Sequence, residues 1–225
     1  MSKKGKNSNY KNNIGQEAVK TVQAPLSKEQ IRNIVIWASA AVLALALIIG
    51  LIGCLMPKTK YVEMDFGSYG KIVIEIDEEE APITAQNFLN LVNSGFYDGR
   101  TIFRAQKNFV IQGGKDTEGE VAAIKGEFKS NGVSNSISHK RGVISMARSG
   151  NSYNSATSQF FITLADTAAK SLDGNYAGFG YVVEGMEVVD AIANALFGHA
   201  IDSMGFVGDA DAITIVSAKV IDYKK

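Results

Sequence analysis

The chain has 225 residues, of which 46% are hydrophobic, and its formal net charge at pH 7 is zero. So many apolar residues are enough for a sizeable core, which excludes a disordered protein. The charge is unevenly distributed, because residues 1–33 carry a net charge of +5 and residues 57–225 carry −5. A basic arm of this kind suits a nucleic acid or an anionic lipid surface, and the segment that follows distinguishes the two.

That segment is an uncharged run of 23 residues, 34–56. As a helix it would be about 34 Å long, against roughly 30 Å of bilayer hydrocarbon. A buried core helix of this length would show a polar stripe, and a signal peptide has a shorter apolar region. We therefore predict a transmembrane helix, with the membrane rather than nucleic acid as partner. Because the positive excess precedes it, we expect residues 1–33 to be a largely disordered cytoplasmic arm and the C-terminal domain to lie outside the cell membrane.

An alternative reading comes from the sequence LIGC at residues 51–54, which resembles a bacterial lipobox. In that case Cys54 would be lipidated and everything before it removed. The long arm ahead of the apolar run favours a retained helix, and either form attaches the domain to the outer face of the membrane. Since Cys54 is the only cysteine, the exported domain has no disulfide and no thiol nucleophile.

Metal sites and a hydrolytic triad have little support. The two histidines, His139 and His199, do not have the spacing of a zinc site, and we expect both in loops or on the surface. A Ser-His-Asp triad would need one of them. The acidic residues within 115–120 lack the twelve-residue pattern of a calcium loop. We therefore predict no metal.

Pro57 breaks the apolar helix, and residues 57–60 are predicted to form a short tether to a domain over residues 61–225. Alternating apolar residues predict strands at 61–66 and 71–76, joined by the turn sequence GSYG. Pro82 then opens an amphipathic helix that stops at Gly95.

Beyond Gly95, short apolar runs separated by Gly, Ser and Asn predict further strands, in the sequences TIF, FVIQ, GVISMA, SQFFITL and FGYVVEG. Residues 186–196 predict a second amphipathic helix, and AITIVSAKVI predicts a last strand that pairs back onto the sheet. The domain is therefore expected to be mainly β, an antiparallel sandwich or barrel.

Four segments occur in order: YDGRTIFRAQKNFVIQGG (97–114), HKRGVISMARS (139–149), SQFFITL (158–164) and LDGNYAGFG (172–180). Together they resemble the cyclophilins, which are peptidyl-prolyl isomerases, over about residues 61–222. HKRG and SMARS resemble the bacterial branch of that family. The resemblance implies a closed, eight-stranded antiparallel β-barrel capped by two α-helices.

Prolyl isomerisation makes and breaks no covalent bond, so neither a nucleophile nor a cofactor is required. The barrier of about 18–20 kcal/mol is the loss of amide resonance as the C–N bond twists. In the twisted state the proline nitrogen regains a lone pair, to which a fixed guanidinium can donate a hydrogen bond. The resemblance implies that Arg104 is this catalytic group and that Gln112 holds the substrate backbone.

The same match implies an apolar slot for the proline ring and a groove beside it. The slot would be formed by Phe109, Val110, Phe161 and Leu172, with Ala147 and Gln159 lining the adjoining groove and Tyr176 replacing a histidine that is common in the family. In a regular strand Phe109 and Gln112 would lie on opposite faces, so a bulge or a strand end must intervene.

We therefore predict a monomeric, membrane-anchored isomerase that acts on X-Pro bonds of exported polypeptides. The main alternative is a non-catalytic chaperone or proline-peptide binding module. It is suggested by Phe103 and Ser171, which stand where many cyclophilins have histidine and tryptophan. A lipoprotein structural subunit, which LIGC would favour, is a third possibility.

Overall fold

The computed structural model describes the backbone of residues 26–55 and 59–224 and the side chains of residues 26–45 and 59–224. Most of the predicted basic arm, part of the tether and the side chain of Cys54 lie outside these ranges. The chain divides into two compact units, Met1–Pro57 and Lys58–Lys225, which are described separately.

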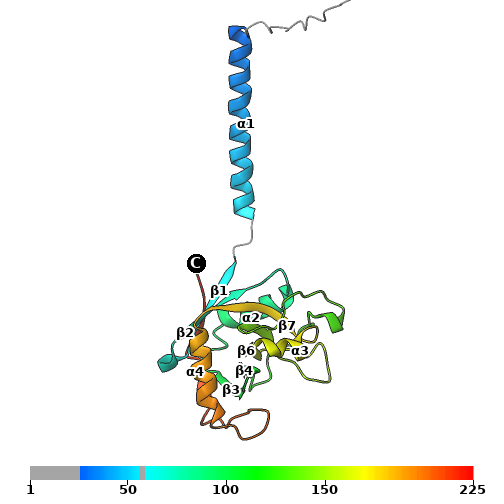
Figure 1. Ribbon diagram of the computed structural model, residues 1–225, viewed down its shortest axis with the longest axis vertical. Coiled ribbons are helices and arrows are strands. Elements are labelled where there is room, and N and C mark those ends of the chain that lie inside the picture. The colour runs from blue at the N-terminus through cyan, green and yellow to red at the C-terminus, as the bar shows by residue number, and fades with distance from the viewer. Residues whose placement is uncertain (1–25, 56–58, 225) are drawn as a thin grey trace, which may run out of the picture. The chain divides into compact units, whose positions relative to one another are not determined.

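In the described part of the first unit, the helix α1 (Lys28–Leu55) follows Ser27 (Figure 1). The Ser27 hydroxyl accepts a hydrogen bond from the Gln30 N–H (3.2 Å), and the Gln30 side chain accepts one from the Ser27 N–H (2.9 Å), which is a capping box. Apolar side chains along the described part of α1, such as Trp37 and Val42, are exposed. Among the described residues, no helix is both long enough and apolar enough to cross a membrane. The transmembrane assignment of residues 34–56 therefore stays a prediction.

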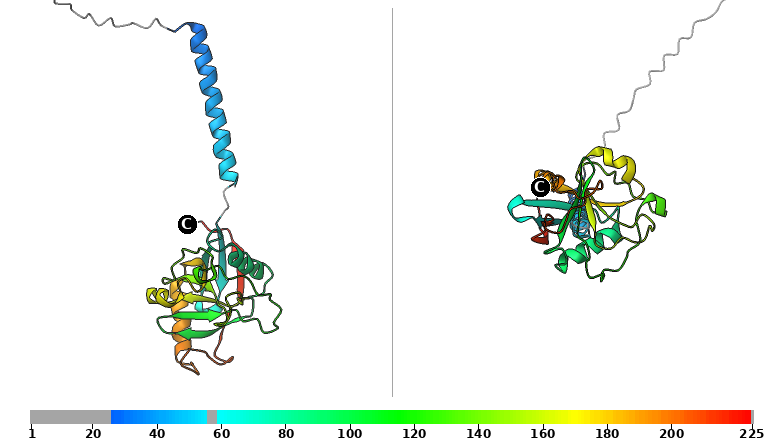
Figure 2. Two further views of the ribbon diagram at one scale, coloured as in Figure 1. Left: turned by 90° about the vertical axis from the view of Figure 1, so that its right-hand side faces the viewer. Right: turned by 90° about the horizontal axis from the view of Figure 1, so that it is seen from below.

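The second unit is built on one antiparallel sheet, whose strands wrap around a common interior (Figures 1 and 2). The strand order is β8-β3-β4-β6-β5-β7-β2-β1-β9. The strands are β1 (Lys60–Asp65), β2 (Lys71–Ile76), β3 (Thr101–Gln106), β4 (Val110–Gly113), β5 (Val143–Met146), β6 (Phe160–Thr163), β7 (Ala177–Glu184), β8 (Ile213–Thr214) and β9 (Ser217–Ile221). The prediction of a mainly β fold is confirmed.

The expected closed barrel of eight strands is wrong, because the sheet is open and the last predicted strand divides in two. β8 pairs with β3 at one edge of the sheet and β9 pairs with β1 at the other. Between them, the Ile215 N–H donates to the Arg100 carbonyl and the Val216 N–H donates to the Asp65 carbonyl. The chain thus crosses from one edge to the other within two residues. The two edges come close together, yet within the described residues β8 and β9 do not pair with each other.

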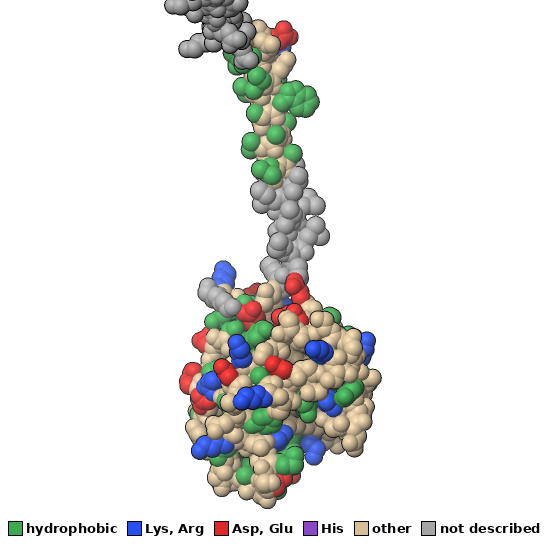
Figure 3. All heavy atoms as spheres, turned by 45° about the vertical axis from the view of Figure 1, so that its right-hand side comes forward, with side chains coloured by type: hydrophobic (Ala, Val, Ile, Leu, Met, Phe, Trp, Pro, Cys, Tyr) green, Lys and Arg blue, Asp and Glu red, His purple; other side chains and the backbone are tan. Residues whose placement is uncertain are grey.

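Two helices pack on this sheet where the sequence predicts them, α2 (Pro82–Asn93) and α4 (Met186–Phe197). The shorter elements are α3 (Ala169–Leu172), η1 (Gly67–Tyr69), η2 (Lys129–Asn131) and η3 (Asp166–Ala168). Phe88 of α2 and Ile192 of α4 belong to the same core as Ile72, Ile74 and Ile76 of β2, and all are almost fully buried. On the face shown in Figure 3, acidic and basic side chains are interspersed over the domain.

The first turn of α2 is capped by a distant residue. Its N-cap, Ala81, has no side-chain hydrogen bond to offer. Instead the buried carboxylate of Glu127 accepts hydrogen bonds from the Ile83 N–H (3.1 Å) and the Thr84 N–H (2.8 Å). These are two of the four N–H groups that a helix leaves without an internal partner, and a negative charge there also interacts favourably with the helix dipole.

Candidate active site

Arg104 owes its orientation to a bulge in β3. The β3–β4 register shifts between Ile102 and Arg104, which makes Phe103 an extra residue on β3. Ile102 and Ala105 are both buried although they are three positions apart, which the two-residue period of a regular strand does not allow. The bulge therefore leaves Phe103 and Arg104 together, both only partly buried, on the other side of the strand.

Strand pairing then aligns Arg104 with two other predicted site residues. Arg104 is paired with Gln112 of β4, and Gln112 is paired with Phe161 of β6. Phe161 in turn is paired with Ser145 of β5. Residues directly opposite on neighbouring strands have Cβ atoms about 5 Å apart, so the register alone creates a row of side chains across four strands.

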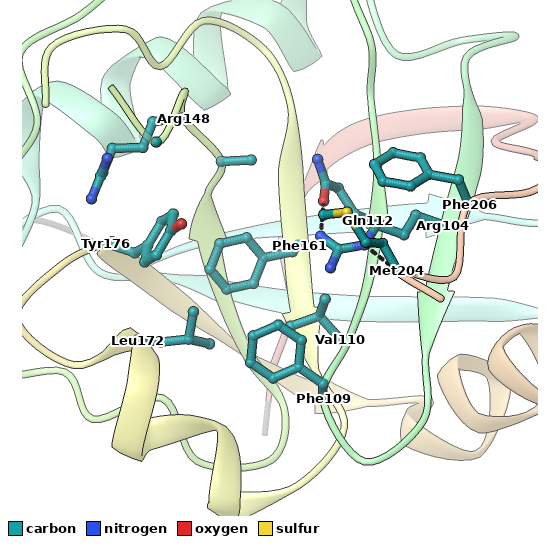
Figure 4. Close-up of a pocket in the computed structure, with 12 residues that line it drawn as sticks. Arg104, Phe109, Val110, Gln112, Arg148, Phe161, Leu172, Tyr176, Met204 and Phe206 are labelled. Carbon is teal, nitrogen blue, oxygen red and sulfur yellow. Dashed lines mark hydrogen bonds between the residues drawn. The ribbon is translucent and has the colours of Figure 1, made fainter. Parts of the chain in front are cut away.

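The guanidinium of Arg104 is held by three hydrogen bonds of 2.8 Å. It donates from Nη1 to Gln112 Oε1, from Nη2 to Gln106 Oε1 and from Nε to the Met204 carbonyl. Its carbon also lies 5.3 Å from the centre of the Phe206 ring. An arginine has five N–H bonds, so two of them have no partner among the described residues and remain available at the pocket (Figure 4). Burial lowers the pKa of Arg104, but an arginine side chain stays charged at neutral pH.

Gln112 links Arg104 to Gln159. Gln112 accepts from Arg104 through Oε1 and donates from Nε2 to Gln159 Oε1 (2.9 Å). The backbone carbonyl of Gln159 accepts a hydrogen bond from the Ala147 N–H (2.8 Å). Gln112 thus orients the arginine, in addition to the substrate contact that the resemblance implies for it.

A cavity of about 350 Å³ opens beside the guanidinium (Figure 4). Every predicted site residue lines this cavity except Gln159, which lines a neighbouring cavity. The residues around it are Arg104, Phe109, Val110, Gln112, Ala147, Arg148, Gly150, Phe161, Leu172, Tyr176, Met204 and Phe206.

Phe109 reaches this cavity because it precedes the strand. It lies in the turn between β3 and β4, where Asn108 has a positive φ of 56°, and β4 begins only at Val110. Of the two explanations that the sequence left open, a bulge or a strand end, the strand end is correct at this position. Val110 and Gln112 are two residues apart on β4 and so share the face toward the cavity.

The floor of the cavity is a small apolar cluster that is distinct from the main core. Val110, Phe161 and Leu172 are buried there together with Ala168. Phe109, Ala147 and Tyr176 pack against this cluster and are themselves partly exposed. The Tyr176 ring meets Phe161 edge to face, with centroids 5.5 Å apart. An apolar floor below a fixed cation is the arrangement that a proline ring and its amide require.

Four residues of the cavity were missed from the sequence: Arg148, Gly150, Met204 and Phe206. Arg148 directly follows Ala147, so the SMARS motif could have indicated it, and its guanidinium lies 4.8 Å from the centre of the Tyr176 ring. Met204 and Phe206 come from the loop after α4 and carry no sequence signal, because only the tertiary structure brings this loop beside β3.

His139 lies below the cavity in a loop, which agrees with the expected loop or surface position, but it is not at the surface. It is fully buried and stacks on Phe161, with centroids 6.0 Å apart. Its Nδ1 lies 2.8 Å from Asp173 Oδ1 and its Nε2 lies 3.0 Å from Ser145 Oγ. Burial lowers the pKa of His139, although the Asp173 carboxylate acts in the opposite direction.

Ser145, His139 and Asp173 are the residue types of a hydrolytic triad, but they are not placed where a substrate could reach the serine. Ser145 is fully buried, so its hydroxyl cannot reach a substrate in the cavity. The hydrogen bonds instead support Phe161 from below. His199, in contrast, is exposed as expected and pairs with Asp211. Within the described part of the chain, no three His, Cys, Asp or Glu side chains are grouped so that they could hold a metal ion.

Comparison with known proteins identifies the family. Residues 61–220 match the family model described as cyclophilin type peptidyl-prolyl cis-trans isomerase/CLD. A peptidyl-prolyl cis-trans isomerase of Acinetobacter baylyi is 45% identical over 129 residues, which are 56% of this chain and 68% of that protein. Peptidyl-prolyl cis-trans isomerase B of Escherichia coli is 36% identical over 139 residues, covering 59% of this chain and 84% of that protein.

Relatives outside the bacteria are equally similar. A Schizosaccharomyces pombe isomerase is 44% identical over 125 residues, covering 54% of this chain and 77% of that protein. These identities do not separate the branches, so the bacterial branch stays a prediction. A crystal structure of a Cryptosporidium parvum cyclophilin type isomerase in the presence of the dipeptide Ala-Pro superposes with a TM-score of 0.60, at 26% identity, over 72% of this chain and 99% of that one. The chain therefore belongs to the cyclophilin-type peptidyl-prolyl cis-trans isomerases, as its sequence motifs predicted.

Proposed function

We propose that the cavity beside Arg104 binds the proline of an X-Pro bond and that Arg104 accelerates its cis-trans isomerisation. The observation that carries this proposal is the guanidinium itself, which is anchored on three sides at the mouth of an apolar slot. In the planar ground state the amide nitrogen is a poor acceptor. As the bond twists, that nitrogen gains a lone pair, and a donor already in place there stabilises the twisted state more than the planar one.

The three anchors are important because they make the donor rigid before the substrate arrives. A free arginine side chain carries about 2 kcal/mol of rotamer entropy, which it would lose on ordering at each catalytic event. Here that cost is met when the domain folds, because Gln112, Gln106 and the Met204 carbonyl already hold the guanidinium. Partial burial also keeps water from weakening the hydrogen bond to the proline nitrogen.

The proline ring is proposed to pack on Phe161, Val110 and Leu172, with Phe109 and Tyr176 at its sides. The ring is thereby held still while the carbonyl on the other side of the bond rotates. Gln112 would contact the substrate backbone through its second amide N–H, since its first donates to Gln159. No cofactor enters this scheme, and one copy of the chain is proposed to be sufficient.

The test compares the purified full chain, in a mild detergent, with two variants in an X-Pro peptide isomerisation assay. We expect Arg104→Ala to lower kcat/KM by roughly 10²- to 10³-fold, as loss of a preorganised donor does in other enzymes. Arg104→Lys should lose most of the activity too, because an ammonium cannot make the same three anchoring bonds. The matched control is Arg141→Lys, at a surface arginine paired with Asp190, which should be nearly neutral.

The binding-module alternative makes a different prediction for the same experiment. It is suggested by Phe103, which stands where many cyclophilins have histidine and stacks on Phe206, a residue that lines the cavity. If the wild-type chain binds proline peptides but does not accelerate their isomerisation, the binding module becomes the better account. If Arg104→Ala is folded and as active as wild type, the catalytic role of Arg104 is wrong.

We further propose that the domain works at the outer face of a cell membrane, with the N-terminus in the cytoplasm, on chains that fold after export. The support comes from the sequence, namely the basic arm followed by the uncharged run of residues 34–56. X-Pro isomerisation takes about 10 to 100 s without catalysis, so it can limit the folding of such chains. Protease added to intact spheroplasts should degrade the domain, and a protected domain would contradict this orientation.

Retention of the helix and lipidation at Cys54 are distinguished by the mature N-terminus. Mass spectrometry of the protein from its native membrane should find the chain beginning ahead of the apolar run. A chain beginning at a lipidated Cys54 would replace the helical anchor by a lipid one and leave the isomerase proposal untouched.

A further inference from the structure

The domain over residues 61–225 contains no cysteine, so methionine supplies all of its sulfur. Met64 and Met146 belong to the main core, with exposed fractions of 0% and 2%, and Met186 is partly buried against that core. Met204, in contrast, is 53% exposed. Among the described methionines it is therefore the one that a dissolved oxidant reaches most easily, because oxidation of a sulfur side chain follows its exposure.

Met204 is also in direct contact with the proposed catalytic group. Its backbone carbonyl accepts a hydrogen bond from Arg104 Nε (2.8 Å). Its side chain lines the same cavity as Arg104 and Gln112, and Figure 4 shows the thioether at their end of that cavity. The most exposed sulfur of the described domain thus lies in the wall of the proposed active site.

The backbone on both sides of Met204 is fixed. Asp202 Oδ1 accepts hydrogen bonds from the Met204 N–H (2.9 Å) and the Phe206 N–H (3.1 Å). The Gly205 carbonyl accepts one from the Ala105 N–H of β3 (2.8 Å). These bonds keep the Met204 side chain at the cavity. A chemical change in that side chain therefore alters the lining without releasing the Met204 carbonyl from Arg104.

A sulfoxide at this position would compete for the guanidinium. Oxidation turns the flexible, apolar side chain of methionine into a polar one, whose new oxygen accepts hydrogen bonds. Arg104 keeps two N–H bonds that no described residue accepts, and these are the bonds available to the proline nitrogen. The proline nitrogen is a good acceptor only in the twisted state, whereas the sulfoxide oxygen is one permanently. A substrate that displaced this oxygen would leave it unpaired beside the apolar slot, at a cost in free energy.

We propose, on the basis of the proposed function, that Met204 is an oxidation site through which hydroperoxides reversibly lower the isomerase activity. The thioether sulfur attacks one oxygen of hydrogen peroxide, so that an S–O bond forms and the O–O bond breaks. The hydroxide that leaves takes up the remaining peroxide proton and departs as water. One electron pair passes from sulfur to the peroxide, which is reduced while the sulfur is oxidised. A methionine sulfoxide reductase returns the sulfoxide to the thioether with electrons from thiols.

The test treats the purified full chain with hydrogen peroxide, removes the peroxide and measures kcat/KM on an Ala-Pro peptide, each chain against its own untreated activity. For the wild-type chain we expect a fall of about tenfold, less than the loss from removing the donor, because Arg104 stays anchored. Peptide mass mapping should find one added oxygen on Met204 before Met186, and a methionine sulfoxide reductase should restore the activity. Met204→Leu, without sulfur at this position, should keep its own activity to within about twofold. Met186→Leu, the matched control outside the cavity, should lose as much as wild type.

A sulfoxide on Met204 that leaves kcat/KM unchanged overturns the inference, as does oxidation of Met186 ahead of Met204. An equal loss of activity in Met204→Leu overturns it too, because the loss would then come from another residue. Failure of the proposed function is seen separately, in the untreated chain. If that chain binds a fluorescently labelled Ala-Pro peptide without isomerising it, the isomerase role is wrong, and weaker binding after oxidation of wild type but not of Met204→Leu supports the oxidation site. An untreated chain that neither binds nor isomerises the peptide refutes both.

Discussion

Glu127→Gln tests whether one buried carboxylate caps α2. The change conserves volume but replaces one carboxylate oxygen by an amide group that cannot accept a hydrogen bond. Either the Ile83 N–H or the Thr84 N–H then loses its partner in a buried setting. The helix also loses the negative charge that lies against its N-terminus.

The size of the effect follows from these two losses. A buried donor without a partner costs about 1–3 kcal/mol, and a charge at a helix N-terminus contributes about 0.3–1 kcal/mol, up to about 2 when partly buried. We therefore expect the free energy of unfolding to fall by about 3 kcal/mol. For a domain of this size, that lowers Tm by roughly 6–12 °C.

Urea denaturation at pH 7 measures this free energy directly, and the slope with denaturant should be unchanged because the folded domain stays compact. The control is Glu120→Gln, which removes the same charge at an exposed position. It should change stability by no more than about 0.5 kcal/mol. If Glu127→Gln is as stable as Glu120→Gln, the carboxylate does not cap the helix and the reasoning is refuted.

Two further predictions concern the site. Gly205→Ala should destabilise the domain by about 1–3 kcal/mol, because Gly205 has a positive φ and the Ala105 carbonyl leaves no room for a Cβ. The same change should lower kcat/KM, because the displaced loop would release the Met204 carbonyl from Arg104. Gly208→Ala in the same loop has open space and should be neutral; equal activities of the two variants would contradict the positioning role of the loop. Burial lowers the pKa of His139, so as pH falls below about 6.5 the unfolded chain takes up a proton that the folded domain does not. Stability should therefore decline from about pH 6.5 down to the lowered folded pKa, and urea titrations from pH 7.5 to 5 should show a shallower decline for His139→Gln; parallel curves would show that His139 is not responsible.

Local sequence patterns were sufficient to predict most of the helices and strands of this domain. The alternation in KIVIEI places Ile72, Ile74 and Ile76 in the core because a strand repeats every two residues, and Pro82 starts α2 because its fixed φ suits the first helical turn. The motif around Arg104 was equally informative. Arg104 and Gln112 are eight residues apart along a hairpin, and with this spacing the β3–β4 register pairs them directly.

The sequence by itself therefore determined the family, the order of the main helices and strands and most of the residues that line the cavity beside Arg104. Only the tertiary structure decided how Arg104 is held and what lies beside it. The Met204 carbonyl that accepts its Nε–H is one hundred residues away, and the division of the last strand between two sheet edges follows from the curl of the whole sheet. His139 is buried because Phe161 and Asp173 close over it. Such contacts depend on which distant surfaces pack together, and periodicity within one segment carries no information about them.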